Sequence, residues 1–534
     1  MKKTIIKITL ILCLFLININ AFSKIPSMVI NSYQAYLHVN SSNFSAKLKK
    51  AMTNVVAGQV WVRVMNSFRK RITSTLGIDI TNINKMKKIG IDIKAESAIV
   101  FSDIFFTQSF YSVLKLKNEN SFYNFLKKKI EKGTNKKCEI KKEIINNNTI
   151  MVFNIDESPK YAIYKTGKYY LVSKNFGLIV KAAQDIKNKL TLETSKFHKK
   201  TQAKFSKSFS TLYVKGSVLS QLINSYLLLK GRSGKINFDP GILNIFINHA
   251  MGFFIEKKSI SIKIYSTINE DHKKAEIFTD MGNTGGFGLN INTYLPPRPY
   301  IYFSLNSKTG NIIEFIKNIY PNFNKKYAKF LKKVDKISNT NLRLSFIRYL
   351  KYKAGFALYT FDPRILILNK QAIRKSKWIM FVESWNPGGM NYALLKVMPD
   401  MGKYFKGATV RRTFIKGYYF YRIRYKNSKF YIGICNNYVI LSTNRKLVSN
   451  VIFRMINLKG TDFLDNLKAK EFKENFEDGS SFNIFVNFKK IFKNSILPTF
   501  ANDMGIRLKN LNNVFLTSKI EDEYSYTVLK ITFK

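Results

Sequence analysis

Cysteine is almost absent from this chain of 534 residues, which contains Cys13, Cys138 and Cys435. An exported domain whose fold depends on disulfides carries many cysteines in a short sequence, so a disulfide scaffold is excluded. Cys138 and Cys435 lie at unmatched positions of the two halves of the chain. One bridge between them and two separate buried thiols both remain open, and the sequence favours the thiols.

Acidic residues are also scarce: 33 aspartates and glutamates stand against 89 lysines and arginines, a formal net charge of +56. Abundant Lys and Asn are typical of a codon bias toward A and T, but such a bias would enrich acidic residues too. A field of this size attracts polyanions, namely anionic lipid, lipopolysaccharide, acidic polysaccharide or nucleic acid. The alternative is a generally basic surface without a dedicated partner.

Histidine occurs four times, as His38, His198, His249 and His272. None of these residues forms an H-x-x-x-H pattern, and none lies near a cysteine in a metal-ligand spacing. We expect His38 in the first strand and His249 in an apolar helix, both with structural roles. The sequence therefore predicts no metal site and no cofactor site.

Long apolar runs are missing as well. A membrane-spanning helix needs about 20 predominantly apolar residues, and the sequence has no run of that length. The apolar segment Ile8–Ile17 follows Lys2, Lys3 and Lys7 and precedes small residues that end at Ser23. This pattern is typical of a secretory signal peptide over residues 1–23, with an uncleaved anchor as the alternative. We expect an exported bacterial protein of the periplasm or the outer envelope surface, without a transmembrane span in the mature chain.

The rest of the chain alternates between helical and strand patterns. Apolar residues recur at three- and four-residue steps from Ser45 to Leu76, which predicts a long helix. Strands are expected at 95–103 and 110–117, then four between Cys138 and Ser173, with helices after Asn118 and at 176–186. Strands in runs with short turns favour antiparallel sheets with helices packed on one face, an α+β fold.

The second half of the sequence repeats the order of the first half. KAESAIVFSD at 94–103 corresponds to KAGFALYTFD at 353–362, and YAIYKTGKYYLVS at 161–173 corresponds to YIGICNNYVILST at 431–443. Agreement in both pattern and order predicts an internal duplication. The expected organisation is two similar modules, each an antiparallel sheet packed with long helices: a first module at 24–281, a Gly-rich linker at 282–294 and a second module at 295–534.

A few short motifs accompany this duplication. Ile25-Pro26 and Leu295-Pro296 open the two halves, and Gly77-Ile78-Asp79 and Gly90-Ile91-Asp92 follow the long helix. The layout resembles a family of exported bacterial proteins catalogued as a domain of unknown function. Their modules open with a strand that begins at a Leu-Pro or Ile-Pro pair, and continue through a long helix and a Gly-Ile-Asp turn into a sheet. The second half has no Gly-Ile-Asp before Lys353. The resemblance implies no catalytic residues.

Three short serine-hydrolase motifs occur in the order found in penicillin-recognising enzymes: Ser112-Val-Leu-Lys115, Ser173-Lys-Asn175 and Lys308-Thr309-Gly310. That chemistry places its serine at the start of a helix, whereas Ser112 falls in a strand pattern. A second K-T-G at Lys165 to Gly167 is typical of a hairpin turn. We therefore predict a protein that is not an enzyme, without catalytic residues, and keep a serine hydrolase as the alternative.

Function is expected to be binding or scaffolding at anionic surfaces, with anionic lipid, lipopolysaccharide or another polyanion as partner. A carrier with an interior cavity for a lipidic ligand is an alternative. Aromatic and basic residues interleave at 417–433, which is also a pattern for binding single-stranded nucleic acid. In a strand, however, alternate aromatics face the core while Arg422, Arg424 and Lys426 share the solvated face, so we expect core packing and no nucleic acid. Oligomeric state is not predicted.

Overall fold

The computed structural model describes most of the chain from residue 25 onward. The signal segment, the expected helix at 45–76, the linker at 282–294 except its last residue, and Lys308-Thr309-Gly310 lie outside the described residues. With short gaps inside some of them, the described ranges are 25–39, 83–103, 109–229, 244–269, 294–306, 347–362, 370–401, 407–457, 480–493 and 511–533, together with isolated positions at 271 and between 325 and 336.

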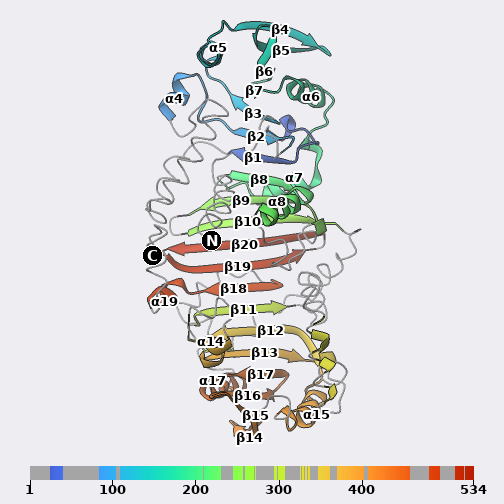
Figure 1. Cartoon of the computed structure of the whole chain (residues 1–534), viewed down its shortest axis with the longest axis vertical. Helices are drawn as coiled ribbons and strands as arrows, with labels where there is room; N and C mark the ends of the chain where they lie inside the picture. Colours follow the sequence, from blue (N-terminus) through green and yellow to red (C-terminus); the bar gives the residue numbers. More distant parts are fainter. Residues whose placement is uncertain are drawn as a thin grey trace. The chain divides into compact units, whose positions relative to one another are not determined.

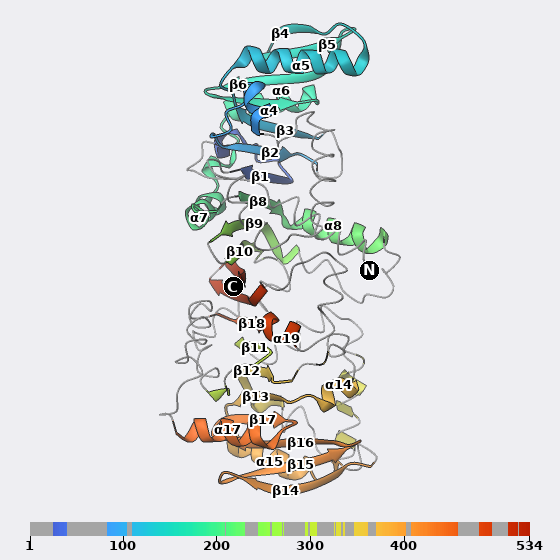
Figure 2. The ribbon, with the colours of Figure 1, turned by 90° about the vertical axis from the view of Figure 1, so that its left-hand side faces the viewer.

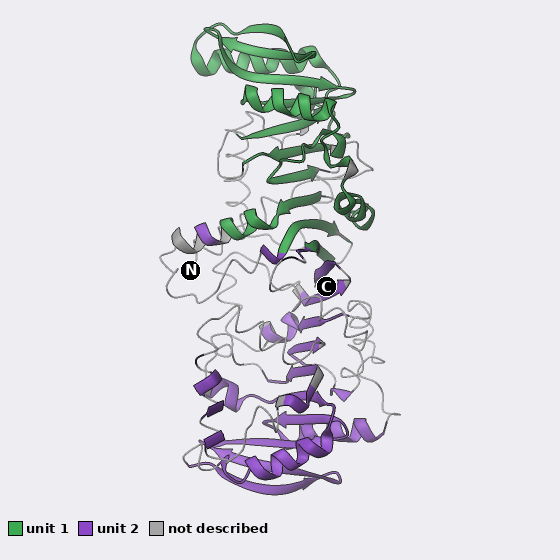
Figure 3. Cartoon of the chain, turned by 90° about the vertical axis from the view of Figure 1, so that its right-hand side faces the viewer, with its two compact units in different colours: residues 1–222, 246–267, 503–507 green, residues 223–245, 268–502, 508–534 purple. Residues whose placement is uncertain are grey.

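The chain divides into two compact units (Figure 3). Unit 1 contains residues 1–222, 246–267 and 503–507, and unit 2 contains residues 223–245, 268–502 and 508–534. Each unit is built on an antiparallel sheet, so the fold is a mixed α and β architecture, as expected for its class. No helix in the described parts of the chain is long and apolar enough to span a membrane.

The sheet of unit 1 has the strand order β4-β5-β6-β7-β3-β2-β1-β8-β9-β10 (Figure 1). The strands predicted at 95–103, at 110–117 and between Cys138 and Ser173 are confirmed. The strands are β1 (Ala35–Val39), β2 (Ser97–Phe101), β3 (Phe110–Lys115), β4 (Glu139–Ile145), β5 (Asn148–Ile155), β6 (Ser158–Thr166), β7 (Tyr169–Ser173), β8 (Ser210–Lys215), β9 (Phe246–Ile255) and β10 (Ser259–Ile268).

The helices of unit 1 follow the predicted pattern after β3 and β7. Asn118 and Asn175 cap the two long helices, because each side chain accepts a hydrogen bond from the amide three residues later. Ile25-Pro26, expected in a strand, lies in a 3-10 turn instead. The helical elements are η1 (Ile25–Met28), α4 (Ile83–Lys88), α5 (Glu119–Thr134), α6 (Phe176–Lys187), η2 (Leu192–Thr194), α7 (Lys196–Lys204) and α8 (Gly216–Leu229), of which the last begins in unit 1 and is assigned to unit 2 from residue 223.

The sheet of unit 2 has the strand order β14-β15-β16-β17-β13-β12-β11-β18-β19-β20 (Figure 1). Its strands are β11 (Ile301–Asn306), β12 (Leu350–Leu358), β13 (Trp378–Ser384), β14 (Thr409–Ile415), β15 (Tyr418–Tyr425), β16 (Ser428–Cys435), β17 (Tyr438–Ser442), β18 (Phe482–Val486), β19 (Leu511–Glu521) and β20 (Tyr524–Phe533). Its helical elements are η4 (Ile347–Tyr349), α14 (Lys370–Lys375), α15 (Pro387–Val397), α17 (Arg445–Ile456) and α19 (Phe488–Lys493).

Helices cover both faces of the sheet, so the expectation of helices on one face is wrong. In unit 1, α5 packs on Tyr161 and Ile163 of β6, whereas Ala162 between them is also fully buried and faces the opposite side, where α6 contacts β6. Figure 1 shows α5 and α6 on the two sides of the sheet, and Figure 2 shows α5 lying over the β4–β5 end. Successive strand residues point to opposite faces, which permits one helix on each.

Unit 2 has the same arrangement with α17 and α15. Phe420 and Tyr431 belong to the core under α17, which also buries Val448, Val451 and Ile452 of the helix. The neighbouring positions of the same strands face α15, which packs on Tyr421, Ile423, Ile432 and Ile434. Each face of the β14–β17 region therefore has its own apolar core.

Tight turns join the hairpins at this end of each sheet. Asn146-Asn147 and Asp156-Glu157 in unit 1, like Lys416-Gly417 and Lys426-Asn427 in unit 2, all have positive φ angles. Two central residues with positive φ define the hairpin turn whose twist matches the flanking strands. The turns fix the register of β4–β6 and β14–β16, and with it the side chains that lie opposite each other.

Candidate functional site

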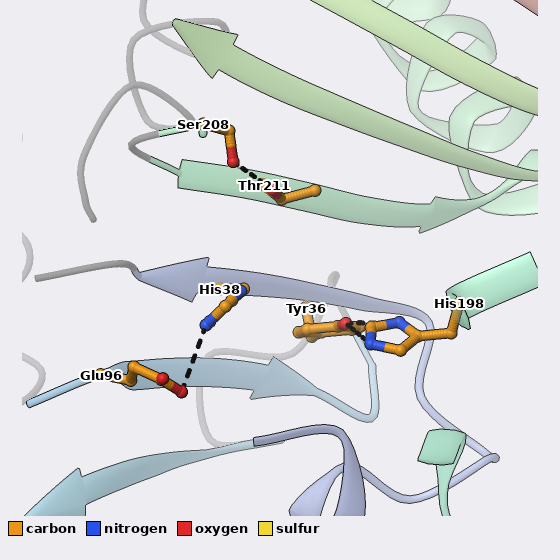
Figure 4. Close-up of polar contacts among 6 residues, drawn as sticks. All are labelled: Tyr36, His38, Glu96, His198, Ser208 and Thr211. Carbon is orange, nitrogen blue, oxygen red and sulfur yellow. Dashed lines mark hydrogen bonds and ion pairs between the residues drawn. The ribbon is translucent and has the colours of Figure 1, made fainter. Parts of the chain in front are cut away.

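Buried polar and aromatic side chains gather on one face of β1 and β8 in unit 1 (Figure 4). The Tyr36 hydroxyl and His198 Nδ1 are 2.9 Å apart, and the Tyr36 ring stacks on Tyr213, its cross-strand partner, with centroids 4.4 Å apart. On the same face, His38 Nε2 lies 3.8 Å from Glu96 Oε2. The structure thus brings together two histidines that are 160 positions apart in the sequence.

The electrostatics of this cluster are those of a closed interior. Burial, with a smaller contribution from His38, lowers the pKa of His198 to about 3, and burial raises the pKa of Tyr36 well above its usual range. His198 and Glu96 are both less than one-tenth exposed. Among the residues that the structure describes, no three His, Cys, Asp or Glu side chains gather at a metal site. The arrangement stabilises a neutral histidine rather than presenting a base to a substrate.

His249 was expected in a helix and lies in strand β9. Its Nδ1 atom is 2.8 Å from the Ser266 hydroxyl on β10, and burial lowers its pKa to about 4. Phe246–Ile255 is apolar on both faces, so it lacks the alternation by which a strand is recognised. The sequence left a core or a surface role open for His249, and the structure places it in the core with a hydrogen bond to Ser266.

The serine-hydrolase motifs do not form one site among the residues that the structure describes. Ser112 and Lys115 lie three positions apart on β3 and so point to opposite faces, and Lys115 is 3.6 Å from Asp92. The Ser173 hydroxyl donates to the Phe110 carbonyl at 2.6 Å and accepts from the amide of Asn175. This S-x-N is therefore part of the N-cap of α6.

The predicted turn at Lys165-Thr166-Gly167 is confirmed, because it joins β6 to β7 with Gly167 at a φ of 57°. Lys165 also lies 2.7 Å from Glu119 of α5. Cys138 and Cys435 are free thiols, both buried, and burial raises the pKa of each.

An exposed basic surface lies on β14–β16 of unit 2. Arg411 pairs directly with Arg422 across β14 and β15, and Arg424 pairs directly with Lys429 across β15 and β16. Alternate positions of a strand share a face, so all four side chains lie on the α17 side of the sheet. Three are exposed and Arg422 is half-buried. We call Arg411, Arg422, Arg424 and Lys429 the basic face.

The basic face has no acidic partner among the residues that the structure describes. The described ion pairs lie on other elements. Examples are Lys141 with Glu139 in β4 of unit 1, and Lys353 with Glu383 in unit 2. Like charges directly opposite each other in a sheet are destabilising, and their Cβ atoms lie about 5 Å apart. Two such pairs side by side concentrate positive charge that an anion can neutralise.

Unit 1 has the same hairpins without this charge pattern. β4 and β14 are both seven residues long, β5 and β15 are both eight, and two residues join each pair. The position of Arg411 is taken by Lys141, which pairs with Glu139 at 3.3 Å, and that of Arg422 by the buried Val152. The basic face therefore belongs to unit 2 specifically.

One signal in the sequence identifies the basic face. No Asp or Glu occurs between Met401 and Thr461, a segment that contains thirteen lysines and arginines. The segment that includes β4–β7 of unit 1, by contrast, carries Glu139, Glu143, Asp156 and Glu157. The sequence predicted alternate aromatics on the core side and Arg422, Arg424 and Lys426 together on the opposite, solvated face, and this is only partly right. Lys426 lies in the turn after β15, and Arg422 and Arg424 share a face with the buried Phe420. Their pairing with Arg411 and Lys429 depends on strand register.

Comparison with known proteins gives little. No protein-family model matches the chain, and no curated protein matches it. The resemblance to exported proteins of unknown function therefore stays a prediction. Among solved structures, the chain is similar to TP0453 of Treponema pallidum. Crystal form I is 10% identical with a TM-score of 0.25, covering 46% of this chain and 79% of TP0453. Crystal form IV is 14% identical with a TM-score of 0.25, covering 46% and 83%. A likeness with so low a TM-score carries no argument about fold or function.

Proposed function

We propose that this chain is an exported, non-catalytic protein of the bacterial envelope that binds anionic surfaces through unit 2. The observation that carries the proposal is the basic face, in which Arg411 opposes Arg422 and Arg424 opposes Lys429 without a described acidic partner. Such pairing costs stability unless an anion lies against it. The predicted export signal and the net charge of +56 agree with a partner at the cell envelope.

The proposal includes an internal duplication, with modules at 24–281 and 295–534. Its support is the strand order, which is the same in both units when each strand of unit 2 is matched to its counterpart ten places earlier. Equal hairpin lengths, positive-φ turns at the same places and one helix on each face add to this support. In this proposal the two copies share a scaffold and differ in surface charge.

A non-catalytic role is favoured by the state of the titratable groups. His198, His249 and Glu96 are buried, and Ser112 and Lys115 point to opposite faces of β3. Catalysis by a general base needs the base within hydrogen-bond reach of a substrate proton. The charged groups of the basic face are guanidinium and ammonium groups, which donate hydrogen bonds to anions and have no acceptor atom for a substrate proton.

Vesicle sedimentation tests this proposal. The mature chain from Lys24 should bind vesicles containing an anionic phospholipid and leave neutral phosphatidylcholine vesicles unbound, with affinity that falls as salt rises. Arg422→Gln with Arg424→Gln should weaken binding about thirtyfold, since each cation near the surface contributes about 1 kcal/mol. The control variant is Lys141→Gln, whose lysine is already paired with Glu139. Equal binding of the chain to both vesicle types would refute the proposal.

A further inference from the structure

We infer that unit 2 meets the anionic lipid surface edge-on through the β14–β15 hairpin, with Phe414 and Tyr419 entering the headgroup layer. The inference rests on the proposed function and identifies its partner as a phospholipid bilayer. It rests on a pair of exposed aromatic rings, on the position of β14 at the edge of the sheet, and on the distribution of charge over both faces of that edge.

Two aromatic side chains are exposed where the hairpin turns. Phe414 is 53% exposed and Tyr419 is 69% exposed, and they are direct cross-strand partners with ring centroids 5.0 Å apart. Large apolar rings exposed together in a soluble domain mark a contact surface. Aromatic rings with apolar bodies are the side chains that concentrate at the interface between membrane and water.

β14 lies at the end of the described sheet of unit 2, with β15 as its neighbour. Its two arginines are both exposed and occupy successive positions, so Arg411 projects from the α17 side and Arg412 from the α15 side. The edge therefore carries cations on both faces. Charged residues at a sheet edge also oppose pairing with another strand, which leaves the edge free for a different partner.

The placement of the rings distinguishes a bilayer from a soluble polyanion. Phe414 and Tyr419 lie on the α15 side, whereas the basic face lies on the α17 side. A polyanion chain lying along the basic face would contact the cations and not the two rings. A lipid surface that meets the hairpin edge-on contacts both sides at once, so its phosphates meet Arg411 and Arg412 while the rings enter between headgroups.

Unit 1 supplies a matched hairpin that lacks these features. The pair that corresponds to Phe414 and Tyr419 is Ile144 and Thr149, which are direct partners across β4 and β5 and are both exposed. Glu139 and Glu143 lie on β4 together with Ile144, and their carboxylates reduce the positive charge of that strand. We expect the β4–β5 hairpin to stay in water under conditions in which the β14–β15 hairpin binds lipid.

A site-specific fluorophore tests the inference. Tyr419→Cys and Thr149→Cys in the mature chain would be labelled with a dye that shifts to the blue in a lipid interface, since Cys138 and Cys435 are buried and remain unlabelled. The vesicles contain phosphatidylcholine with one-third phosphatidylglycerol, with and without a spin-labelled headgroup. We expect a blue shift and quenching for the dye at position 419 and neither change at position 149. Both positions respond identically if the inference is wrong.

Equilibrium binding supplies a second measurement. Phe414→Ser with Tyr419→Ser changes two exposed rings that do not belong to an apolar core, so the variant should fold, and its vesicle affinity should fall about tenfold or more. Unchanged affinity of this variant, with wild-type binding to anionic vesicles retained, would overturn the inference and leave the proposed function standing. Equal loss of affinity for soluble polyphosphate would also overturn it. Absence of wild-type binding to anionic vesicles would instead refute the proposed function.

Discussion

Acidification from pH 8 to pH 5 should destabilise unit 1 far more than unit 2, because two buried histidines of unit 1 remain neutral in the folded state. His198 lies against Tyr36 of β1, Tyr213 of β8 and the nearby His38, and His249 lies against Ser266. Burial lowers the pKa of His198 to about 3 and that of His249 to about 4. The described residues of unit 2 contain no histidine.

The sign and size follow from linkage between protonation and folding. In the unfolded chain a histidine has a pKa of about 6.5, so below that pH the unfolded state binds a proton that the folded state does not. The stabilising contribution is complete above pH 6.5 and is lost as the pH falls toward the folded-state pKa. At pH 5 the contribution of each histidine to the free energy of unfolding is about 2 kcal/mol smaller than at pH 8, or about 4 kcal/mol for the two together.

The two buried cysteines allow each unit to be followed separately. Cys138 lies in unit 1 and Cys435 in unit 2, so a reagent that labels thiols at acidic pH reports unfolding of each unit in urea by mass spectrometry. A loss of about 4 kcal/mol moves the Cys138 midpoint down by about 1–2 M urea between pH 8 and pH 5. His198→Gln should remove about half of this shift. A Cys138 midpoint that stays constant, or moves together with that of Cys435, would refute the reasoning.

Three further predictions concern unit 2. Asn444→Ala removes the side-chain acceptor for the amide of Leu447 at the start of α17 and should lower the unfolding free energy by about 1 kcal/mol in urea titrations. Gly433→Ala places a Cβ atom 2.6 Å from the Phe420 ring, so it should cost about 1–3 kcal/mol by the same measurement, and a neutral result would contradict the packing. Arg422→Glu sets a carboxylate opposite Arg411; stability should rise by about 0.2–1 kcal/mol while affinity for anionic vesicles falls, and a parallel fall in both would contradict the pairing.

Local signals made much of the fold predictable. Asn118 and Asn175 mark helix starts because their side chains replace missing backbone partners within three residues. The hairpin at Lys165-Thr166-Gly167 was recognisable because glycine adopts a positive φ without strain. Such features depend on neighbours in the sequence, so they can be predicted without knowing which elements meet in space.

The errors came where the outcome depends on distant residues. His249 lies in a segment that is apolar on both faces, and a doubly buried strand has the same composition as a buried helix. The second helix layer arises because alternate residues of β6 and β16 are apolar on both sides, which becomes evident only when a helix is seen on each. The buried His38–Glu96 and Tyr36–His198 contacts likewise require the pairing of β1 with β2 and the docking of α7.

The candidate site was predictable in part for the same reason. Interleaved aromatic and basic residues at 417–433 indicated that Arg422 and Arg424 share a face, since strand residues alternate, but not that the buried Phe420 lies on the same face. The opposition of Arg411 to Arg422 depends on a two-residue turn that sets the register between β14 and β15. Without that register, the sequence gives the number of basic residues in the segment but not which of them lie opposite each other.

The contrast between the two units argues against codon bias as the source of the positive charge. A bias that acts on the whole gene would add lysines to both units and leave acidic residues beside them, as Glu139 lies beside Lys141 in unit 1. In unit 2 the acidic residues are missing from 401–461, and Arg411, Arg422 and Arg424 are arginines rather than lysines. Arginine binds phosphate with two parallel hydrogen bonds, whereas lysine acts as a point charge. Charges that oppose each other at some cost to the sheet, in the residue type suited to phosphate, are what selection for binding would retain.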